Sequence, residues 1–274
     1  MSLHDPQTLY RHWEQQQWSP FEIDLAADRA QWLEMSGSDR DLVLWALSSL
    51  MVAEERITTK FSGLLGAYGS EEEATFLATQ QVDEARHMQF YARFQDEVIA
   101  DPGSIARHVE RSRDQLSPDF KIIFDEALVG AHEKLVASPA DAAAKVEFVT
   151  TYHLVIESTL GLTAFEFITR YLEREQLLAG FVAGYSKIHH DEHRHIGYGV
   201  WFLRESVRSA PGLADRVRDT LRRQLPAVAS SLAPPDRDST DWDGLGASAQ
   251  QIRDFALDGL SRRLKVIGIP LESL

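Results

Sequence analysis

DEARH at residues 83–87 and DEHRH at residues 191–195 are two copies of one short pattern in this chain. Each copy contains a glutamate that is followed three residues later by a histidine. Residues three positions apart lie on the same face of an α-helix, so each copy would present a carboxylate and an imidazole side by side. A single copy is weak evidence for a metal site, because such pairs are common on solvated helices. Two copies make a shared metal site a much stronger prediction.

The sequence around both copies has helical periodicity. No Asn-Gly or Asp-Gly pair joins two alternating runs, so strand signals are almost absent. We therefore predict an all-α fold in which the longest helices form a bundle core, as one domain over residues 1–274 with an N-terminal arm at 1–35 and a surface loop at 233–246. The helices are expected at about 40–67, 70–100, 104–115, 118–137, 140–173, 175–208, 212–232 and 247–266.

Two further glutamates lie in apolar settings on the other long helices, Glu54 after Leu50–Ala53 and Glu157 after Leu154–Ile156. The resulting order is Glu, Glu-x-x-His, Glu, Glu-x-x-His, which is the order in four-helix bundles that hold two metal ions. Glu55 competes with Glu54 for the first position, but Ala53 and its apolar neighbours place Glu54 nearer the core face. The predicted ligands are Glu54, Glu84, His87, Glu157, Glu192 and His195.

The charges of this ligand set support a pair of metal ions. Four buried carboxylates without partners would be prohibitively costly, whereas they would neutralise two divalent cations. The chain has no cysteine, which excludes thiolate zinc sites and iron–sulfur clusters. Several oxygens and one nitrogen per ion favour iron or manganese, and two open-sided redox metals indicate dioxygen chemistry. The alternative is that Glu54 and Glu157 pair with arginines, and it requires all six residues to fall in this order by chance.

Composition excludes several other classes of protein. The 274 residues are 44% hydrophobic and 26% charged, as in an ordinary globular domain. The formal net charge of −14 disfavours binding to nucleic acid and to anionic membranes. No apolar run is long enough to span a membrane, and the N-terminus does not look like a signal peptide. We expect a cytoplasmic protein.

Several motifs resemble the ribonucleotide reductase small subunit superfamily, and most of all its ligand-binding oxidases. These motifs are WSPFEID at residues 18–24, DRA at 28–30, AEE at 53–55, TYHLVIE at 151–157 and the two copies quoted above. The resemblance runs from about Trp18 to Leu264 and implies a ferritin-like bundle with a manganese–iron or di-iron site. It also implies a long-chain fatty acid or similar apolar ligand beside the metals, and a homodimer. Apolar side chains that could line such a pocket include Leu160, Leu162, Phe165 and Phe61.

The resemblance assigns a role to Tyr152, which lies five residues before Glu157. In those oxidases a tyrosine at this position is joined through its oxygen to a valine side chain. The valine position is Ile57 here, and isoleucine keeps the tertiary Cβ hydrogen that such a crosslink replaces. The alternative for Tyr152 is a buried aromatic residue with a hydrogen-bonded hydroxyl.

Tyr91 keeps a radical-generating function open. It lies four residues after His87, where the ribonucleotide reductase small subunit holds its stable tyrosyl radical and where the ligand-binding oxidases are expected to have Phe. Trp18 and Asp191 match the electron-transfer pair of that subunit, with His87 as the third member. The chain ends soon after its last helix, without the long tyrosine-bearing tail that docks on the catalytic subunit. Trp18 and Tyr91 have packing roles as their alternative.

Two other functions are weaker. Arylamine N-oxygenases with related di-iron chemistry place a third histidine ligand four residues before the glutamate of the motif, but Ile188 occupies that position here. We expect His189, His190 and His193 to be solvated. A non-enzymatic metal store would need many ions per chain. In all readings, Asp191 and Gln80 are candidates to hold His87 or a bridging carboxylate.

Overall fold

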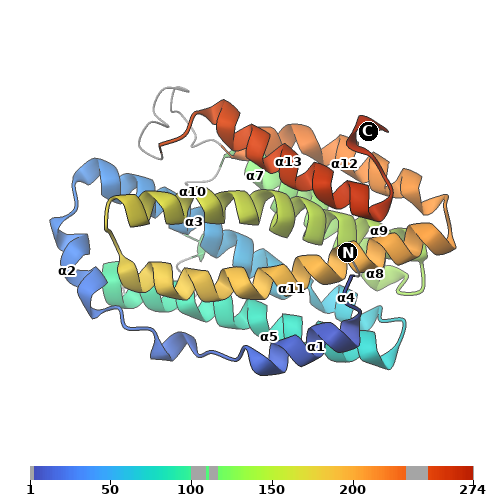
Figure 1. The fold of residues 1–274 in the computed structure, drawn as a ribbon, viewed down its shortest axis with the longest axis horizontal. Helices are drawn as coiled ribbons and strands as arrows, with labels where there is room; N and C mark the ends of the chain where they lie inside the picture. The colour runs from blue at the N-terminus through green and yellow to red at the C-terminus, as the bar shows by residue number, and fades with distance from the viewer. Residues whose placement is uncertain (1–2, 100–108, 111–116, 233–245, 274) are drawn as a thin grey trace.

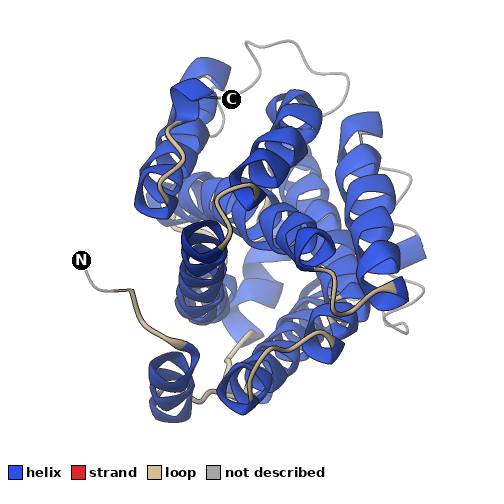
Figure 2. Ribbon diagram, turned by 90° about the vertical axis from the view of Figure 1, so that its right-hand side faces the viewer, coloured by secondary structure: helices blue, strands red, loops and turns tan. Residues whose placement is uncertain are grey.

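The computed structural model describes residues 3–99, 109–110, 117–232 and 246–273. Within these residues the elements are helices, and no strand occurs among them (Figure 2). The prediction of an all-α fold is confirmed. In chain order the elements are α1 (Pro6–Gln15), η1 (Pro20–Glu22), α2 (Ala26–Glu34), α3 (Gly37–Lys60), α4 (Ser62–Gly66), α5 (Glu71–Phe94), η2 (Gln95–Ile99), α7 (Pro118–Lys121), η3 (Ile122–Ala127), α8 (Leu128–Ala137), α9 (Ala142–Val149), η4 (Thr150–Gly161), α10 (Leu162–Arg174), α11 (Ala179–Ser209), α12 (Leu213–Ser231), α13 (Ala249–Ile267) and η6 (Leu271–Ser273).

Four long helical rods form the core, and each carries part of the predicted ligand set. They are α3, α5, the continuous run of α9, η4 and α10, and α11. Helix α3 packs on α5, and α11 packs on both α5 and η4. Helices α12 and α13 cover η4 on one side, while α1 lies along α5 and α11 on the other (Figure 1).

Local signals fix where the helices of the core begin. The Ser36 hydroxyl accepts a hydrogen bond from the backbone N–H of Asp39 and caps α3. Ser70 caps α5 in the same way through Glu73, and three glutamates occupy the first turn of α5, where the helix dipole favours negative charge. These caps set the helical phase from which the ligand residues of α3 and α5 point inward.

The structure differs from the predicted helices at the N-terminus and after Lys60. The sequence predicts no helix in the arm 1–35, but the structure contains α1 and α2 there. The missed signal for α1 is Asp5 followed by Pro6, because the Asp5 carboxylate caps the helix and proline is favoured at its first position. The helix predicted at 40–67 divides into α3 and α4 at Phe61. The predicted helix 104–115 and loop 233–246 fall almost entirely outside the described residues.

Three segments, η2, η3 and η4, are π-helical, which the sequence analysis does not predict. The longest is η4, in which the Thr159 hydroxyl donates to the Leu154 carbonyl at 2.6 Å, five residues earlier. π-Helical turns are rare and occur often at functional sites. Here η4 carries both Tyr152 and Glu157, so the wider turn determines how these two side chains face the core.

Two glycines let α11 approach its neighbours closely. A Cβ atom at Gly199 would lie 2.3 Å from Cβ of His153 on η4, and one at Gly184 would lie 2.2 Å from the ring of Phe90 on α5. Side chains at these positions would therefore push the helices apart. Among the described residues, no helix is both long and apolar enough to cross a bilayer.

Candidate metal centre

The structure brings the six predicted ligands together in two overlapping groups. In each group, one oxygen or nitrogen atom per residue lies within 4.8 Å of the others. Glu84 and Glu192 belong to both groups, so they lie where bridging carboxylates would lie. The first group adds Glu54 and His87, and the second adds Glu157 and His195.

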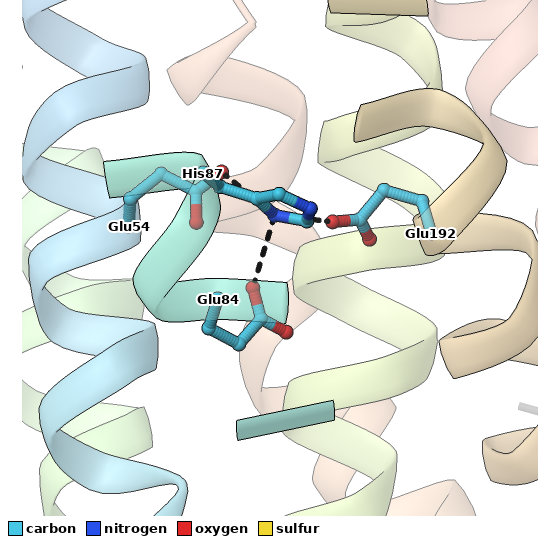
Figure 3. Close-up of side chains that lie close together, drawn as sticks. All are labelled: Glu54, Glu84, His87 and Glu192. Carbon is cyan, nitrogen blue, oxygen red and sulfur yellow. Dashed lines mark ion pairs between the residues drawn. The ribbon is translucent and has the colours of Figure 1, made fainter. Parts of the chain in front are cut away.

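In the first group, the Nδ1 atom of His87 faces three carboxylates (Figure 3). It lies 3.3 Å from Oε2 of Glu84, 3.6 Å from Oε1 of Glu192 and 3.8 Å from Oε1 of Glu54. These residues come from α3, α5 and α11, so the group joins three of the four core rods. The imidazole ring is completely buried.

The second group repeats this arrangement around His195. Its Nδ1 atom lies 3.3 Å from Oε1 of Glu84, 3.4 Å from Oε1 of Glu157 and 3.9 Å from Oε1 of Glu192. Glu84 therefore turns one oxygen towards each histidine. This orientation places a carboxylate between two positions for metal ions.

Each of the six ligands has a buried atom without a hydrogen-bond partner. Buried polar atoms in proteins are nearly always hydrogen-bonded, since an unpaired one is costly. Six such atoms on residues of two overlapping groups fit two cations, because the cations would bind their free lone pairs. The atoms are Oε2 of Glu54, Glu84, Glu157 and Glu192, and Nδ1 of His87 and His195.

Protons compensate part of this buried charge in the metal-free site. Burial raises the pKa of the Glu157 carboxyl to about 8. Burial disfavours the charged form of Glu84 as well, but His195 and His87 outweigh it and hold the pKa of that carboxyl well below its usual range. Burial opposes a charge on His87, while the nearby carboxylates of Asp191, Glu54 and Glu84 raise the pKa of its imidazole well above the ordinary value. The metal-free site therefore combines protonated and ionised groups.

Each histidine is oriented by the aspartate of the other motif. Nε2 of His87 lies 3.1 Å from Oδ2 of Asp191, and Nε2 of His195 lies 3.2 Å from Oδ2 of Asp83. A carboxylate on the outer nitrogen fixes the ring and makes the inner nitrogen a better ligand. The repeated Asp-Glu-x-Arg-His pattern is therefore an interlocking pair in which Asp83 and Asp191 exchange partners.

Two tryptophans and one arginine hold the aspartates in place. Nε1 of Trp18 donates to Oδ2 of Asp191 at 2.8 Å, and Nε1 of Trp13 donates to Oδ1 of Asp83 at 2.9 Å. Arg194 donates to both aspartates and lies between them. The sequence analysis identifies Trp18 with Asp191 but misses Trp13, Arg194 and the function of Asp83. The repeated aspartate before each motif glutamate was the available signal for Asp83.

The hydroxyl of Tyr152 points into the site. It donates a hydrogen bond of 2.6 Å to Oε1 of Glu84, the carboxylate shared by both groups. Burial raises the pKa of this phenol, and the charges of Glu84 and Glu157 raise it further. Gln80 does not hold His87, one of its two expected partners. Its amide donates to Oε1 of Glu157 at 3.0 Å and makes a longer hydrogen bond of 3.5 Å to Oε1 of Glu84, a carboxylate shared by both groups.

Tyr91 lies in an aromatic pocket beside the first group. Its ring centroid is 5.7 Å from that of Phe90, 6.4 Å from that of Phe181 and 6.5 Å from that of Tyr185. Within the described residues its buried hydroxyl has no hydrogen-bond partner. Burial raises the pKa of the Tyr91 phenol, with smaller contributions from Tyr185 and Glu54.

The alternative ligands lie outside the site. Glu55 pairs with Arg56 at 3.2 Å, so Glu54 is the glutamate of α3 that faces the other ligands. His190 and His193 are exposed, as expected. His189 is half-buried instead of solvated, because its ring stacks on Phe165 with centroids 3.6 Å apart.

A cavity of about 140 Å³ opens beside three of the ligands. Among the described residues, its charged lining residues are Glu54, Glu157 and Glu192. Of the four apolar residues expected to line a pocket, Leu160 does so, whereas Leu162, Phe165 and Phe61 do not, because they lie on other faces of their helices. Apolar residues that line the cavity include Leu50, Ala53, Ile57, Phe124, Ile156 and Leu160.

Comparison with known proteins finds one matching family model and several solved structures with the same fold. The family model described as ribonucleotide reductase, small chain, matches residues 1–226. An R2-like ligand-binding oxidase with a tyrosine-to-phenylalanine substitution and an aerobically reconstituted Mn/Fe cofactor superposes with a TM-score of 0.83 at 20% identity, covering 96% of this chain and 93% of that one. A valine-to-leucine variant with an anaerobically reconstituted Mn/Fe cofactor gives 0.83 at 21% identity over the same shares. A glycine-to-leucine variant with a non-activated Mn/Mn cofactor matches equally well, with a TM-score of 0.83 at 21% identity and the same coverage. These structures share the fold of this chain.

Proposed function

Because this chain belongs to the ribonucleotide reductase small-chain family, we propose that it is a dimetal oxidase that activates dioxygen. The observation that carries the proposal is the set of six ligands in two overlapping groups, each with a buried atom that has no hydrogen-bond partner among the described residues. Two ions, manganese and iron or two irons, would supply the electrons for reduction of dioxygen and the oxidising power to remove hydrogen from a C–H or O–H bond. The solved structures with this fold and an Mn/Fe cofactor support that choice of metals.

The protein's own contribution is charge balance and orientation. Four carboxylates would neutralise two divalent ions, and the residues that would hold them are Glu54 and His87 in one group, Glu157 and His195 in the other, with Glu84 and Glu192 in both. Asp83 and Asp191 hold both imidazoles with Nδ1 inward, so the ligands are arranged before metal binds.

We propose that the cavity beside Glu54 and Glu157 takes an apolar ligand. No lysine or arginine lines it among the described residues, so within this part of the chain an acidic head group would find its cationic partner at the metals. The volume of about 140 Å³ is below the ~300–1,000 Å³ of pockets for drug-sized ligands. A short apolar acid, or one end of a fatty acid, matches this volume better than a complete long chain.

Tyr152 is the proposed internal substrate, with Ile57 as its partner. The phenol donates to Glu84, and Ile57 on α3 lines the cavity beside Glu54 and Glu157. A crosslink would form one bond between the Tyr152 oxygen and Cβ of Ile57. It would break one O–H and one C–H bond, so that two protons and two electrons leave and the electrons pass to the oxidised metals.

This crosslink makes a prediction about mass. After metal loading and exposure to air, the intact chain should be lighter by two hydrogen atoms, and a Tyr152→Phe variant should keep its full mass. Peptide mass spectrometry should then find Ile57 and Tyr152 in one linked fragment. An unchanged mass in the oxidised wild-type protein would contradict the crosslink but not the metal site.

Tyr91 supports a second candidate function, a radical-generating subunit that works with a partner reductase. Its buried phenol lacks a hydrogen-bond partner among the described residues and is surrounded by aromatic rings, which would protect a radical from solvent. Electron paramagnetic resonance on the same oxidised samples distinguishes the two functions. A stable tyrosyl signal that is lost in Tyr91→Phe favours the radical subunit, and its absence favours the oxidase.

The metal site itself is tested by metal content. After expression with iron and manganese, inductively coupled plasma mass spectrometry should find about two ions per chain, and Glu84→Ala should reduce them to fewer than about 0.2. Glu55→Ala is the matched control, because Glu55 neighbours a ligand but pairs with Arg56. Loss of metal in both variants, or in neither, would reject the proposed ligand set.

We also propose a homodimer, in line with the resemblance seen in the sequence. Several large apolar side chains are exposed to solvent. The exposed fractions are 68% for Phe21, 61% for Leu33 and 49% for Val82. Symmetric pairing is the commonest way in which such surface is buried. Light scattering coupled to size-exclusion chromatography would show twice the chain mass if this is correct.

A further inference from the structure

A second series of hydrogen-bonded side chains, a tryptophan, an aspartate and a histidine, leads away from the metal centre. The proposed function does not use it. Trp13 donates to Oδ1 of Asp83 at 2.9 Å, and Oδ2 of Asp83 lies 3.2 Å from Nε2 of His195. His195 belongs to the second group of ligands. The order of groups matches that of Trp18, Asp191 and His87 on the first group, so each metal position has its own indole.

This second series of side chains continues from Trp13 to the surface, where it ends at the phenol of Tyr10. Tyr10 lies one turn before Trp13 on α1, with ring centroids 6.1 Å apart and ring planes at 24°. Its hydroxyl donates to Oε1 of Glu14 at 2.5 Å, and Glu14 is exposed. A carboxylate in this position can accept the phenol proton at the moment when the phenol loses an electron.

The surroundings of the two indoles differ. The guanidinium of Arg86 lies over the Trp18 ring, 5.6 Å from its centroid, and a cation there opposes removal of an electron from the indole. Within the described residues no cation is found over the Trp13 ring. Arg86 and Arg194 also bind Asp83, and its carboxylate offsets part of their charge beside the Trp13 indole. We therefore expect the indole of Trp13 to be easier to oxidise than that of Trp18.

We propose that Trp13 and Tyr10 form a one-electron path by which oxidising equivalents leave the metal centre for the surface. The proposal rests on the dioxygen chemistry proposed above, with dioxygen as the oxidant of the metals. Tyr10 would lose one electron, which would pass through Trp13, Asp83 and His195 to an oxidised metal held by His195. The phenol proton moves to Glu14, leaving a neutral tyrosyl radical and a carboxylic acid. A small one-electron reductant such as ascorbate then restores the phenol, with the proton returning from Glu14.

The test traps the radical at Tyr10. Protein loaded with ferrous iron under anaerobic conditions is exposed to air with a nitrone spin trap, and adducts are located by peptide mass spectrometry. The wild-type protein should carry the adduct at Tyr10. Trp13→Phe should lower it about tenfold or more. The control is Tyr68, an exposed phenol outside α1, which should carry no adduct.

Two further measurements separate electron transfer from a positioning role. Trp13→His keeps a ring N–H donor for Asp83 without an oxidisable indole, so it should keep the metal content and lose the Tyr10 adduct. A wild-type protein that consumes oxygen but carries no adduct at Tyr10, or an equal adduct in Trp13→Phe, would overturn the path while leaving the oxidase intact. A loaded protein that consumes no oxygen would overturn both proposals.

Discussion

At the scale of single residues, the site depends on two aspartates that touch no metal position directly. Asp83 binds His195 and Asp191 binds His87, and each is held by its own indole. Removing the negative charge weakens the hold on the ring and lowers the basicity of the inner nitrogen. The two histidines therefore respond to substitutions on the opposite motif.

We predict that Asp83→Asn and Asp191→Asn each lower metal affinity by about 10–100-fold. Asp83→Asn should weaken chiefly the position at His195, and Asp191→Asn the position at His87. Anaerobic titration with cobalt(II), followed by its visible spectrum, measures both positions.

Asp215→Asn is the matched control, because Asp215 is largely exposed and pairs with Arg218 on α12. It should bind two ions with unchanged affinity. Equal affinities in Asp83→Asn, Asp191→Asn and the wild-type protein would show that the aspartates do not tune the ligands.

The ligands could be predicted from sequence because their spacing is local. Glu84 and His87, like Glu192 and His195, share a helix face whatever the rest of the fold does. The contacts of Trp13 could not be predicted, since they join residues seventy positions apart and depend on how α1 docks. Long-range hydrogen bonds of this kind leave no periodic signal in the chain.

At the scale of elements, the close approach of α11 to η4 sets the width of the site. Gly199 lies four residues after His195, and a Cβ there would meet the ring carbons of His153. The helical periodicity predicts the rods but not their separation, which depends on side-chain size at each crossing. Nor does it predict the π-helical turns of η4, because π and α turns have the same apolar pattern over a few residues.

We predict that Gly199→Ala destabilises the metal-free protein by about 1–3 kcal/mol, because the added methyl overpacks the crossing. Gly130→Ala is the control, since a Cβ at Gly130 in α8 meets nothing within 4 Å. It should stabilise by about 0.5–1 kcal/mol, as alanine is the better helix former. Urea denaturation measures both free energies, and a stable Gly199→Ala protein would show that the crossing can widen at no cost.

At the scale of the whole molecule, protons and metal ions compete for one buried cluster of charge. The free carboxylates and imidazoles of the metal-free site take up protons, and metal binding must release them. Burial places the pKa of Glu157 near 8, and the pKa values of His87 and His195 are raised by the carboxylates around them, although burial opposes this. The stability of the metal-free protein should therefore depend on pH in a range where surface carboxylates no longer titrate.

The sign follows from proton counts. The folded-state pKa of Glu157 lies above its unfolded value, so between about pH 4.5 and 8 the folded chain binds more protons than the unfolded one, and stability falls as pH rises. His87 and His195 act in the same direction, because their contribution is present below the unfolded pKa of about 6.5 and is lost at higher pH.

We predict that unfolding of the metal-free protein costs about 1–3 kcal/mol less at about pH 8 than at about pH 6. Anaerobic manganese(II) should stabilise more at the higher pH, because fewer protons compete with it. Thermal unfolding with and without the ion measures both effects, and Glu157→Gln, which cannot ionise, should show a smaller pH dependence. A metal-free protein that becomes more stable between these pH values would contradict the proposed balance of protons and metal ions in the site.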